Sequence, residues 1–487
     1  MGVAAFAVIA SAPGSPLRPL QPSASAPLEG AAETLGLANR SLGTLIVLTG
    51  VGLGITIGGF LVFLRQAERG RVSLKAALVL SVVSLLVTLF LPLLYSRDVY
   101  IYAMYGRILA VHHANPYLVP PDSFPSDPFY VLVGKDWQHT TPVYGPVFVL
   151  IAAGVASTLH SVLSVVMAFR LLSALAGLLT VIVVAGIARR ICPERAAAAV
   201  VFIGMNPVVL YSTVAGGHND TLVSLGIVTS LALILARRNM LATALLTLTL
   251  LIKIVVFVLL IIWIFADVAE RPPGDRLRRL LRHVVVMLVV AVPVLALFLR
   301  GGNPTLGQIG LLKDIGATPA NWIREIAQGV GRLVSPAGGE VMSGLVRVMA
   351  LALLAVAVCA IAWSIGRRAA SGGVCAGALG AAWAWALVPF ELLSLVFLPW
   401  YLVWVLPIAW VLPLEGRRFL IAVSVLQMFT LVVVDFELLP RAHNEGAWVA
   451  LFLVAPLILL FAIEPMRLLV SRLRSGAPLE AEDLVSA

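Results

Sequence analysis

The chain has 487 residues, of which 60% are hydrophobic and only 12% charged, and its mean hydropathy is +1.02. A soluble domain is about 45 to 50% apolar and a quarter charged, so this composition excludes an ordinary soluble protein. The net charge of +10 comes from short Lys and Arg clusters between apolar runs, which is the positive-inside pattern of membrane proteins. We therefore expect an all-α integral membrane protein that contacts membrane lipids and binds no nucleic acid.

The N-terminal region is weakly apolar for twelve residues and then rich in Ser, Pro and Ala to about residue 30. This pattern fits either a poor signal peptide or a disordered tail, and we favour the tail. The sequence then predicts a disordered segment at 1–42, a single transmembrane domain at 43–472, and a cytoplasmic C-terminal tail at 473–487.

Apolar runs recur along the whole predicted domain. A helix needs about 20 apolar residues to cross the hydrocarbon core, and eleven runs approach that length, in a bundle of about 11 to 13 spans. They lie near 43–64, 76–95, 165–188, 197–214, 220–236, 284–299, 346–366, 374–391, 396–412, 418–435 and 447–466.

Two further apolar segments, 145–160 and 240–266, are assigned from charge asymmetry. The basic clusters around them all face the cytoplasm only if neither segment crosses completely. We predict that 145–160 is re-entrant or interfacial, and that 240–266 forms two half-helices meeting near Lys253. An intramembrane Lys is costly and is by default a functional hypothesis. It either binds the phosphate of a lipid-linked substrate or snorkels to the interface.

Three loops are then expected outside, at 97–144, 301–344 and 437–446. In the first, Tyr102 and Tyr105 recur at helical spacing, which predicts amphipathic helices on the outer leaflet. Asp98 stands just beyond the apolar run, where it either caps the helix or acts as a general base on a sugar hydroxyl.

Aromatic and amide side chains of the kind that bind sugars recur in these segments. Residues 216–220 read GGHND, which fits a helix break capped by Asn or Asp or a shaped pocket, and one His is weak evidence for a metal. Late aromatic residues fit interface anchors or sugar ligands. The candidate sugar or acceptor contacts are Tyr100, Tyr102, Asn115, Tyr117, Trp137, Tyr144, His218, Asn219, Asp220, Trp400 and Tyr401.

Taken in order, the segments RDVYIYAMYGR, HHANPY, TPVYGP, NPVVLYSTVAGGHND, LLIKIVV and LPWYLVW resemble the polyprenol-phosphate-mannose-dependent α-1,6-mannosyltransferases of the GT-C superfamily. These enzymes elongate the mannan core of actinobacterial lipoglycans. The landmarks run from about residue 95 to 410 and cover most of the chain.

The resemblance implies a multi-pass transferase of the cell membrane with its active site on the outer face. Its donor would be a polyprenyl-phosphate sugar and its acceptor a lipid-anchored glycan. Asp98 matches the acidic base of the first outer loop, and a single displacement would invert the anomeric carbon. Lys253, helped by Arg107 or Arg441, would neutralise the leaving phosphate.

The chain departs from many GT-C relatives because one acid, rather than an adjacent acidic pair, stands at the junction of span and loop. We therefore expect no metal and no other cofactor. Arabinose or glucose on a similar carrier is the nearest alternative to mannose. A lipid-linked sugar flippase or transporter, or a scaffold for envelope assembly, would show many of the same features.

Overall fold

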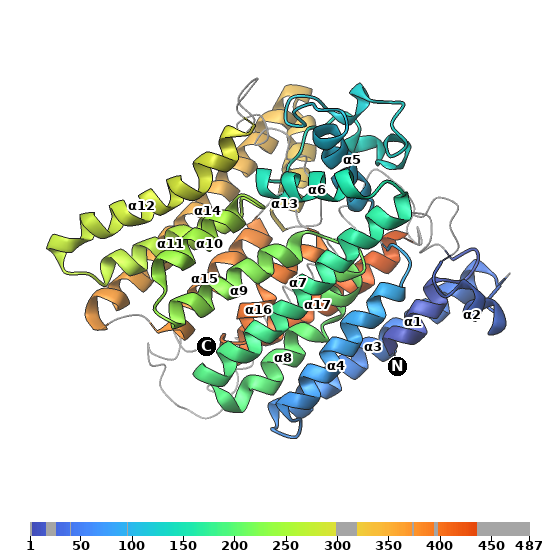
Figure 1. Ribbon diagram of the computed structural model, residues 1–487, viewed down its shortest axis with the longest axis horizontal. Helices are drawn as coiled ribbons and strands as arrows, with labels where there is room; N and C mark the ends of the chain where they lie inside the picture. Colours follow the sequence, from blue (N-terminus) through green and yellow to red (C-terminus); the bar gives the residue numbers. More distant parts are fainter. Residues whose placement is uncertain are drawn as a thin grey trace.

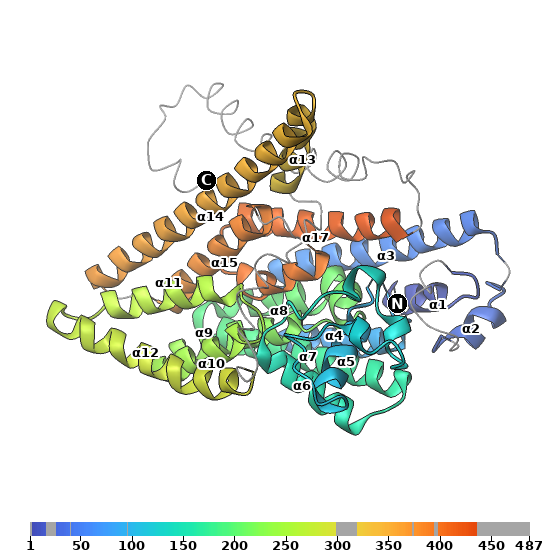
Figure 2. The ribbon, with the colours of Figure 1, turned by 90° about the horizontal axis from the view of Figure 1, so that it is seen from above.

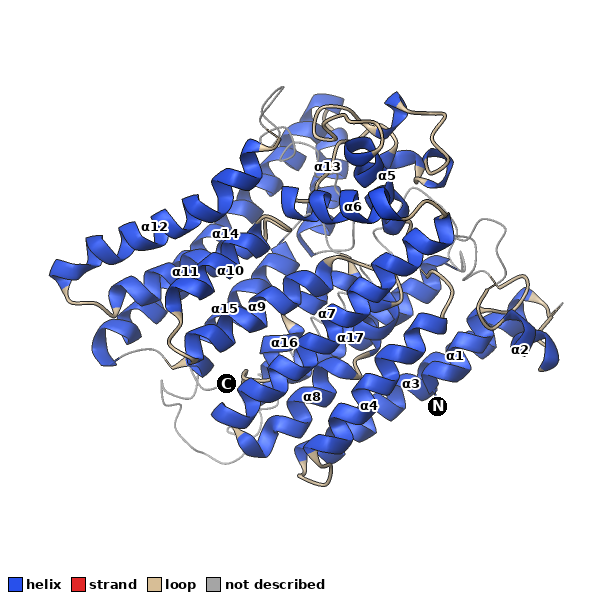
Figure 3. Ribbon diagram, viewed as in Figure 1, coloured by secondary structure: helices blue, strands red, loops and turns tan. Residues whose placement is uncertain are grey.

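The computed structural model describes residues 2–15, 26–38, 40–94, 96–298, 319–372, 375–393 and 398–435. All regular secondary structure in these ranges is helical (Figure 3), which confirms the all-α prediction. The α-helices are α1 Gly2–Ala10, α2 Glu29–Thr34, α3 Leu42–Glu68, α4 Leu74–Val87, α5 Asp98–Ala110, α6 Pro146–Thr158, α7 Val162–Ile191, α8 Ala196–Gly204, α9 Asp220–Leu235, α10 Asn239–Leu250, α11 Val256–Ala269, α12 Pro273–Ala296, α13 Pro319–Arg332, α14 Pro336–Gly372, α15 Ala376–Leu393, α16 Leu406–Ala409 and α17 Leu414–Asp435.

Shorter helical turns connect these elements. The 3₁₀ turns are η1 Thr88–Phe90, η2 Pro121–Ser123, η3 Tyr130–Leu132, η4 Lys135–Trp137, η5 Pro193–Arg195 and η8 Pro399–Trp404, and η6 Val208–Val214 is a π-helix. Most helices run side by side in one bundle, with α5 and α6 together near one end (Figure 1). Figure 2 shows α14 on the outside of this bundle, where it packs against α11 and α15.

Within the described ranges, four helices are long and apolar enough to cross a membrane: α3, α7, α12 and α14. A fifth span is possible if 193–204 and 208–214, which are bent by 42° relative to one another, act together. The bend lies at Pro207, which has no N–H to donate, and the Asn206 side chain accepts the Val208 N–H at 3.0 Å.

Several of the eleven expected spans are therefore shorter than predicted. The apolar helical stretches in segments 76–95, 220–236 and 374–391 are each shorter than 18 residues. The expected span at 396–412 is wrong, because η8 and the short α16 replace a continuous helix there. Pro399 and Pro407 each stand at the start of one of these pieces, where proline is tolerated.

The broken hairpin at 240–266 is confirmed. α10 ends at Leu250 and α11 begins at Val256, so Lys253 lies in the break. The carbonyls of Leu251 and Ile252 accept the N–H groups of Val147 and Gly145, at 3.0 and 2.9 Å. Irregular backbone at membrane depth needs such partners.

Gly145 is required for that contact, since a Cβ atom there would lie 2.1 Å from the Leu251 carbonyl oxygen. It stands directly before α6, whose free N-terminal N–H groups suit the exposed carbonyls of the hairpin. At 13 residues, α6 is shorter than a full span, as the charge pattern predicted for 145–160.

The prediction of an amphipathic surface helix after Asp98 is wrong. α5 is buried on nearly every side, with each residue from Val99 to Gly106 inaccessible to solvent. The ring of Tyr102 packs edge-on against Phe148 of α6 and Phe169 of α7. Two neighbouring helices thus cover the face that we expected lipid to cover.

The N-terminal region also differs from the prediction, because residues 2–10 form α1 rather than a disordered tail. Phe6 is fully buried and packs on Tyr211 with ring centroids 4.5 Å apart. The apolar side chains of α1 bury enough surface against α3 to keep this helix folded. Part of the expected outer loop 301–344 is likewise helical, in α13 and the start of α14. The loop 437–446, the span at 447–466 and the tail at 473–487 lie outside the described residues.

Candidate active site

Predicted site residues from five separate segments meet in one group, which we call the Asp98 centre. The contributing segments are the start of α5, the residues before α6, the turn before α9, the break between α10 and α11, and η8. The Asp98 centre comprises Asp98, Tyr102, Tyr144, His218, Asp220, Lys253, Trp400, Tyr401 and Trp404.

Asp98 is the first residue of α5, and its N–H donates to Ser96 Oγ at 3.0 Å. Its carboxylate lies 3.5 Å from His218 Nδ1. It also accepts from the hydroxyls of Tyr102 at 3.4 Å and Tyr144 at 3.3 Å. The side chain keeps 16% of its surface exposed, so the protein does not cover it completely.

The electrostatic surroundings of Asp98 keep it ionised. Burial by itself raises the pKa of this carboxyl, but the hydrogen bond and charge of His218, helped by Ser96 and Lys253, hold the pKa below its ordinary value. Burial also raises the pKa of Tyr102 and Tyr144, so both phenols remain neutral donors. The carboxylate is therefore a proton acceptor at neutral pH.

Asp220 and Lys253 form a second ion pair in the centre. Lys253 Nζ donates to Asp220 Oδ1 at 2.6 Å, and Trp404 Nε1 donates to the same oxygen at 2.7 Å. Asp220 begins α9, where the helix dipole favours a carboxylate. Lys253 Nζ lies over the rings of Tyr401 and Trp404, 4.3 and 4.9 Å from their centroids.

The turn at 216–220 connects these two ion pairs. Gly217 has φ +68°, and a Cβ atom there would lie 2.9 Å from Val99 Cγ1, so this position needs glycine. His218 is fully buried and stacks on Trp400 with ring centroids 3.9 Å apart. Asn219 occupies the N-cap position of α9 but makes no capping hydrogen bond. The interpretation of GGHND as a simple capped helix break is therefore wrong.

The aromatic residues of η8 are not interface anchors. Trp400 is 5% exposed, which leaves little surface for lipid head groups, and Tyr401 stacks on Trp404 with centroids 4.3 Å apart. Of these three residues, sequence reasoning missed Trp404. Its signal was the repeated aromatic spacing of PWYLVW, which places Trp404 beside Tyr401 in a tight helical turn.

Arg107, expected near the phosphate, is engaged elsewhere. Its Nε lies 2.9 Å from both carboxylate oxygens of Asp127, and its guanidinium lies 4.9 Å from the centroid of Phe129. His112 Nε2 contacts the same carboxylate at 2.7 Å. The expectation that Arg107 helps to bind the phosphate is corrected, because its ion pair with Asp127 stabilises the loop after α5 and lies outside the Asp98 centre. Arg441 lies outside the described residues.

Three other expected sugar contacts support the same loop. Asn115 Nδ2 donates to the Phe298 carbonyl at 2.8 Å, while its Oδ1 accepts the Tyr117 N–H. Tyr117 donates its hydroxyl to the Tyr144 carbonyl at 2.8 Å. Trp137 is partly buried in η4, where its carbonyl accepts from a Thr hydroxyl. These contacts hold Tyr144 in place but do not bring the three side chains to Asp98.

Tyr100 of α5 and Arg170 of α7 are both buried. Burial raises the pKa of Tyr100 to about 12. Arg170, which sequence reasoning missed, is 1% exposed and donates to the Thr88 carbonyl at 2.7 Å. Its side chain packs under Gly217. An Arg in the middle of an apolar 30-residue helix was the available signal, since such residues are rare without a role.

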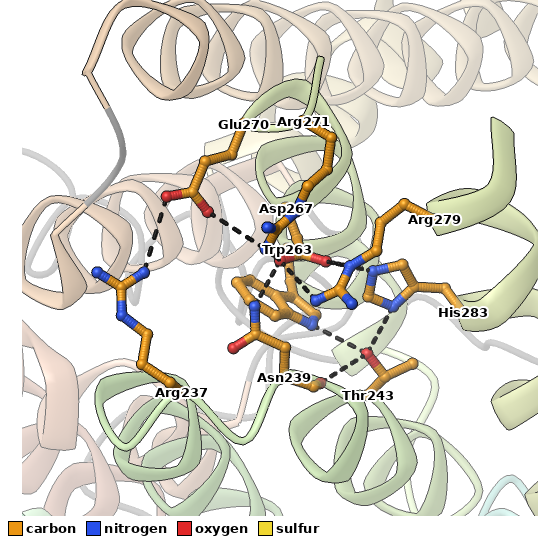
Figure 4. A network of polar contacts seen from close by, with 9 residues as sticks. All are labelled: Arg237, Asn239, Thr243, Trp263, Asp267, Glu270, Arg271, Arg279 and His283. Atoms are coloured by element: carbon orange, nitrogen blue, oxygen red, sulfur yellow. Dashed lines mark hydrogen bonds and ion pairs between the residues drawn. The ribbon is translucent and has the colours of Figure 1, made fainter. Parts of the chain in front are cut away.

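A second polar group, the Asp267 cluster, was also missed (Figure 4). It joins α10, α11 and α12 through Asp267, whose carboxylate is fully buried and contacts Arg279, His283 and Asn239. A cavity of about 210 Å³ lies beside it, between α9, α11 and α15. Asp267 alone in an apolar helix gave little indication of its partners. The cluster comprises Asn239, Thr243, Trp263, Asp267, Arg271, Arg279 and His283.

The structure thus defines a membrane protein whose buried acid, cation and aromatic side chains meet in one partly accessible centre, as in a membrane-embedded transferase. Among the described residues, no group of three or more His, Cys, Asp or Glu side chains is arranged to hold a metal ion.

The chain belongs to the α-(1→6)-mannopyranosyltransferase family, whose N-terminal domain matches residues 1–269. It is 25% identical over 416 residues to α-(1→6)-mannopyranosyltransferase A of Mycobacterium tuberculosis, a match that covers 82% of this chain and 77% of the relative. No solved structure matches it significantly. The chain is therefore a glycosyltransferase, and the expected resemblance is confirmed.

Proposed function

We propose that the protein transfers mannose from polyprenyl-phosphate-mannose to a growing α-1,6-mannan or lipoglycan acceptor on the outer face of the cell membrane. In this proposal Asp98 is the general base and Lys253 binds the donor phosphate. One observation carries the proposal: an ionised carboxylate and a Lys lie at the two sides of the turn of residues 218–220. In the part of the chain that the structure describes, the Lys253 ammonium donates one hydrogen bond, to Asp220.

The proposed reaction is a single displacement. Asp98 accepts the proton of the acceptor hydroxyl, whose oxygen attacks the anomeric carbon of mannose from the face opposite the phosphate. The bond from that carbon to the phosphate oxygen breaks, and the phosphate leaves with the bonding electrons. The anomeric configuration inverts, the proton remains on Asp98, and His218 stays beside the carboxyl group throughout.

Lys253 is suited to the phosphate. An ammonium group has three N–H donors, and Asp220 accepts only one of them. The rings of Tyr401 and Trp404 hold the ammonium in place through cation–π contacts. A fixed cation of this kind stabilises charge that develops on a leaving phosphate. We therefore propose a metal-independent reaction, and activity lost in EDTA and restored by Mg²⁺ or Mn²⁺ would contradict it.

The direction of the helices supports the proposed outer location of the site. Tyr102, whose hydroxyl contacts Asp98, packs on Phe169 in the N-terminal half of α7. Arg189 and Arg190 lie in the last turn of that helix. Asp220 begins α9, and Arg237 follows its end. Because Lys and Arg clusters mark the cytoplasmic side, the opposite ends of α7 and α9 would face outward.

The test is mannose transfer in membranes that carry the wild type, Asp98→Asn or the matched control Asp122→Asn. Asp122 is a partly exposed acid of the same loop, paired with His139. We expect Asp98→Asn to lose about 10²- to 10⁴-fold in rate and Asp122→Asn to transfer normally. Equal activity of both variants would exclude Asp98 as the base.

The same assay tests the donor and the class of protein. Wild-type transfer from polyprenyl-phosphate-arabinose or polyprenyl-phosphate-glucose, but not from the mannose donor, would replace mannose by that sugar. Movement of the lipid-linked sugar across vesicles without formation of a glycosidic bond would favour a flippase.

A further inference from the structure

The turn that connects the two ion pairs contains an unusual number of unsatisfied polar atoms. Buried polar groups are nearly always hydrogen-bonded, and each exception calls for an explanation. Among the described residues, four buried side-chain atoms without a hydrogen-bond partner belong to three consecutive residues: His218 Nε2, both Nδ2 and Oδ1 of Asn219, and Asp220 Oδ2.

Asn219 is the most exceptional of the three. Its side chain is 2% exposed, and neither the donor nor the acceptor of its carboxamide is used. As the N-cap residue of α9 it could accept an N–H from the first turn of that helix, yet it makes no such bond. The fold has thus buried a complete donor–acceptor pair without giving it a partner.

The position of Asn219 identifies the part of the substrate that it would meet. Its neighbour His218 contacts the base Asp98, and its other neighbour Asp220 binds the phosphate-binding Lys253. During transfer the donor sugar ring lies between the attacking hydroxyl and the leaving phosphate. Since Asn219 stands between His218 and Asp220 along the chain, the donor ring is the part of the substrate nearest to it in the proposed reaction.

We propose that the Asn219 carboxamide binds two adjacent hydroxyl groups of the donor mannosyl unit. Nδ2 donates to one hydroxyl oxygen, and Oδ1 accepts from the neighbouring hydroxyl, so both unused atoms are satisfied. Asn219 is then a specificity-determining residue, because a site built to hydrogen-bond a hydroxyl strongly rejects an analogue that lacks it. This inference rests on the proposed function and adds the contact that recognises the donor sugar by its hydroxyl groups.

The test is a double-mutant cycle between Asn219 and the hydroxyls of the donor. Wild type, Asn219→Ala and Asn219→Asp are assayed with polyprenyl-phosphate-mannose and with its 2-, 3-, 4- and 6-deoxy forms. Asn219→Asp keeps the shape and the acceptor oxygen but removes the N–H donor. Asn239→Ala, which removes another Asn with an unpaired Oδ1 in the Asp267 cluster, is the control.

We expect the wild type to lose about 10- to 100-fold in kcat/KM when either of two adjacent hydroxyls is absent, because one buried atom of Asn219 then stays unpaired. Asn219→Ala should show a similar loss with the complete donor and no further loss with those two deoxy donors. Asn219→Asp should become insensitive to only one of them. Asn239→Ala should discriminate as the wild type does.

Undiminished discrimination by Asn219→Ala against every deoxy donor would overturn the inference and leave the proposed function intact. Failure of the wild type to use the complete donor would reject the proposed function itself, and the assignment of Asn219 with it. A structural role alone would lower the amount of folded protein without changing the pattern of discrimination.

Discussion

The Asp98 centre and the Asp267 cluster both bury carboxylates beside cations, but they differ in how completely the polar atoms are paired. Both oxygens of Asp267 have partners, supplied by Asn239, Arg279 and His283 (Figure 4). At the Asp98 centre, four buried atoms are unpaired in the turn of residues 218–220, two of them on Asn219 between His218 and Asp220. Complete pairing is typical of a contact that stabilises the fold, whereas unpaired buried atoms are typical of a ligand-binding site.

The position of the unpaired atoms also differs between the two groups. In the Asp267 cluster, the unpaired buried atoms are Asn239 Oδ1 and Arg271 Nε, on side chains that bond to Asp267 through their other atoms. In the Asp98 centre, the unpaired atoms lie between the proposed base and the proposed phosphate-binding Lys253. Unpaired buried polar atoms cost free energy, which favours a ligand-binding role for this turn over a purely structural one.

The largest predicted effect is on stability. Asp267→Ala removes the common partner of Arg279 and His283, and leaves their side chains in a buried site without a counter-charge. We expect a loss of about 3 to 5 kcal/mol in the free energy of unfolding. Thermal unfolding in detergent measures it, with the more exposed Glu270→Gln as the control.

Activity per folded molecule should remain near that of the wild type in Asp267→Ala, since Asp267 makes no contact with the Asp98 centre among the described interactions. A variant that folds normally but transfers no mannose would contradict this distinction, because the Asp267 cluster would then be required for transfer itself.

The next largest effect is expected from Lys253. Lys253→Gln removes the cation, and we expect transfer to fall about 10²- to 10³-fold, as when one preorganised transition-state donor is lost. The variant is also less stable, because Asp220 keeps its charge without the ammonium.

The double variant Lys253→Gln/Asp220→Asn separates these two effects. It removes both charges, so the melting temperature should recover while transfer stays low. If transfer recovers together with the melting temperature, Lys253 serves the fold rather than the phosphate.

An intermediate effect is predicted for pH dependence. The lowered pKa of Asp98 means that activity falls only when the pH drops through this lowered value. His218 contributes the largest lowering influence, so His218→Gln leaves burial to dominate and raises the pKa. We expect the acidic limb of kcat/KM to move to higher pH than in the wild type.

His112→Gln is the matched control for the pH profile, since His112 contacts another carboxylate, that of Asp127. It should leave the acidic limb where it is in the wild type. A limb that does not move in His218→Gln would remove the proposed link between His218 and the base.

Much of the Asp98 centre could be predicted because its polar and charged residues are exceptional in so apolar a sequence. Lys253 in an apolar run and the GGHND turn stand out for that reason. The break near Lys253 followed from charge asymmetry together with the length of the segment. By contrast, the burial of α5 could not be predicted, because its Tyr residues suit both a lipid interface and a protein core. Only the packing of α6 and α7 distinguishes the two.

The pairing of residues that are distant in the sequence was the second feature that could not be predicted. Nothing in the sequence shows that Arg107 is bound by Asp127, 20 residues away, or that Trp404 donates to Asp220, 184 residues away. The local sequence of Asp267 likewise gives no sign of His283. Residue type indicated which side chains were exceptional, but the fold decided whether each was paired or left available.

The smallest predicted effect concerns the two phenols on Asp98. The Tyr102 and Tyr144 hydroxyls lie 3.4 and 3.3 Å from the carboxylate, which is long for a hydrogen bond to an ionised group. Tyr144→Phe keeps the ring packing and should lower kcat/KM by less than about tenfold, in line with about 0.5 to 1.5 kcal/mol for one hydrogen bond. Tyr105→Phe loses a bond to the Thr140 carbonyl and should change stability but not kcat/KM. A loss for Tyr144→Phe as large as that for Asp98→Asn would mean that the phenol takes part in proton transfer, and the base would then be the pair rather than the carboxylate alone.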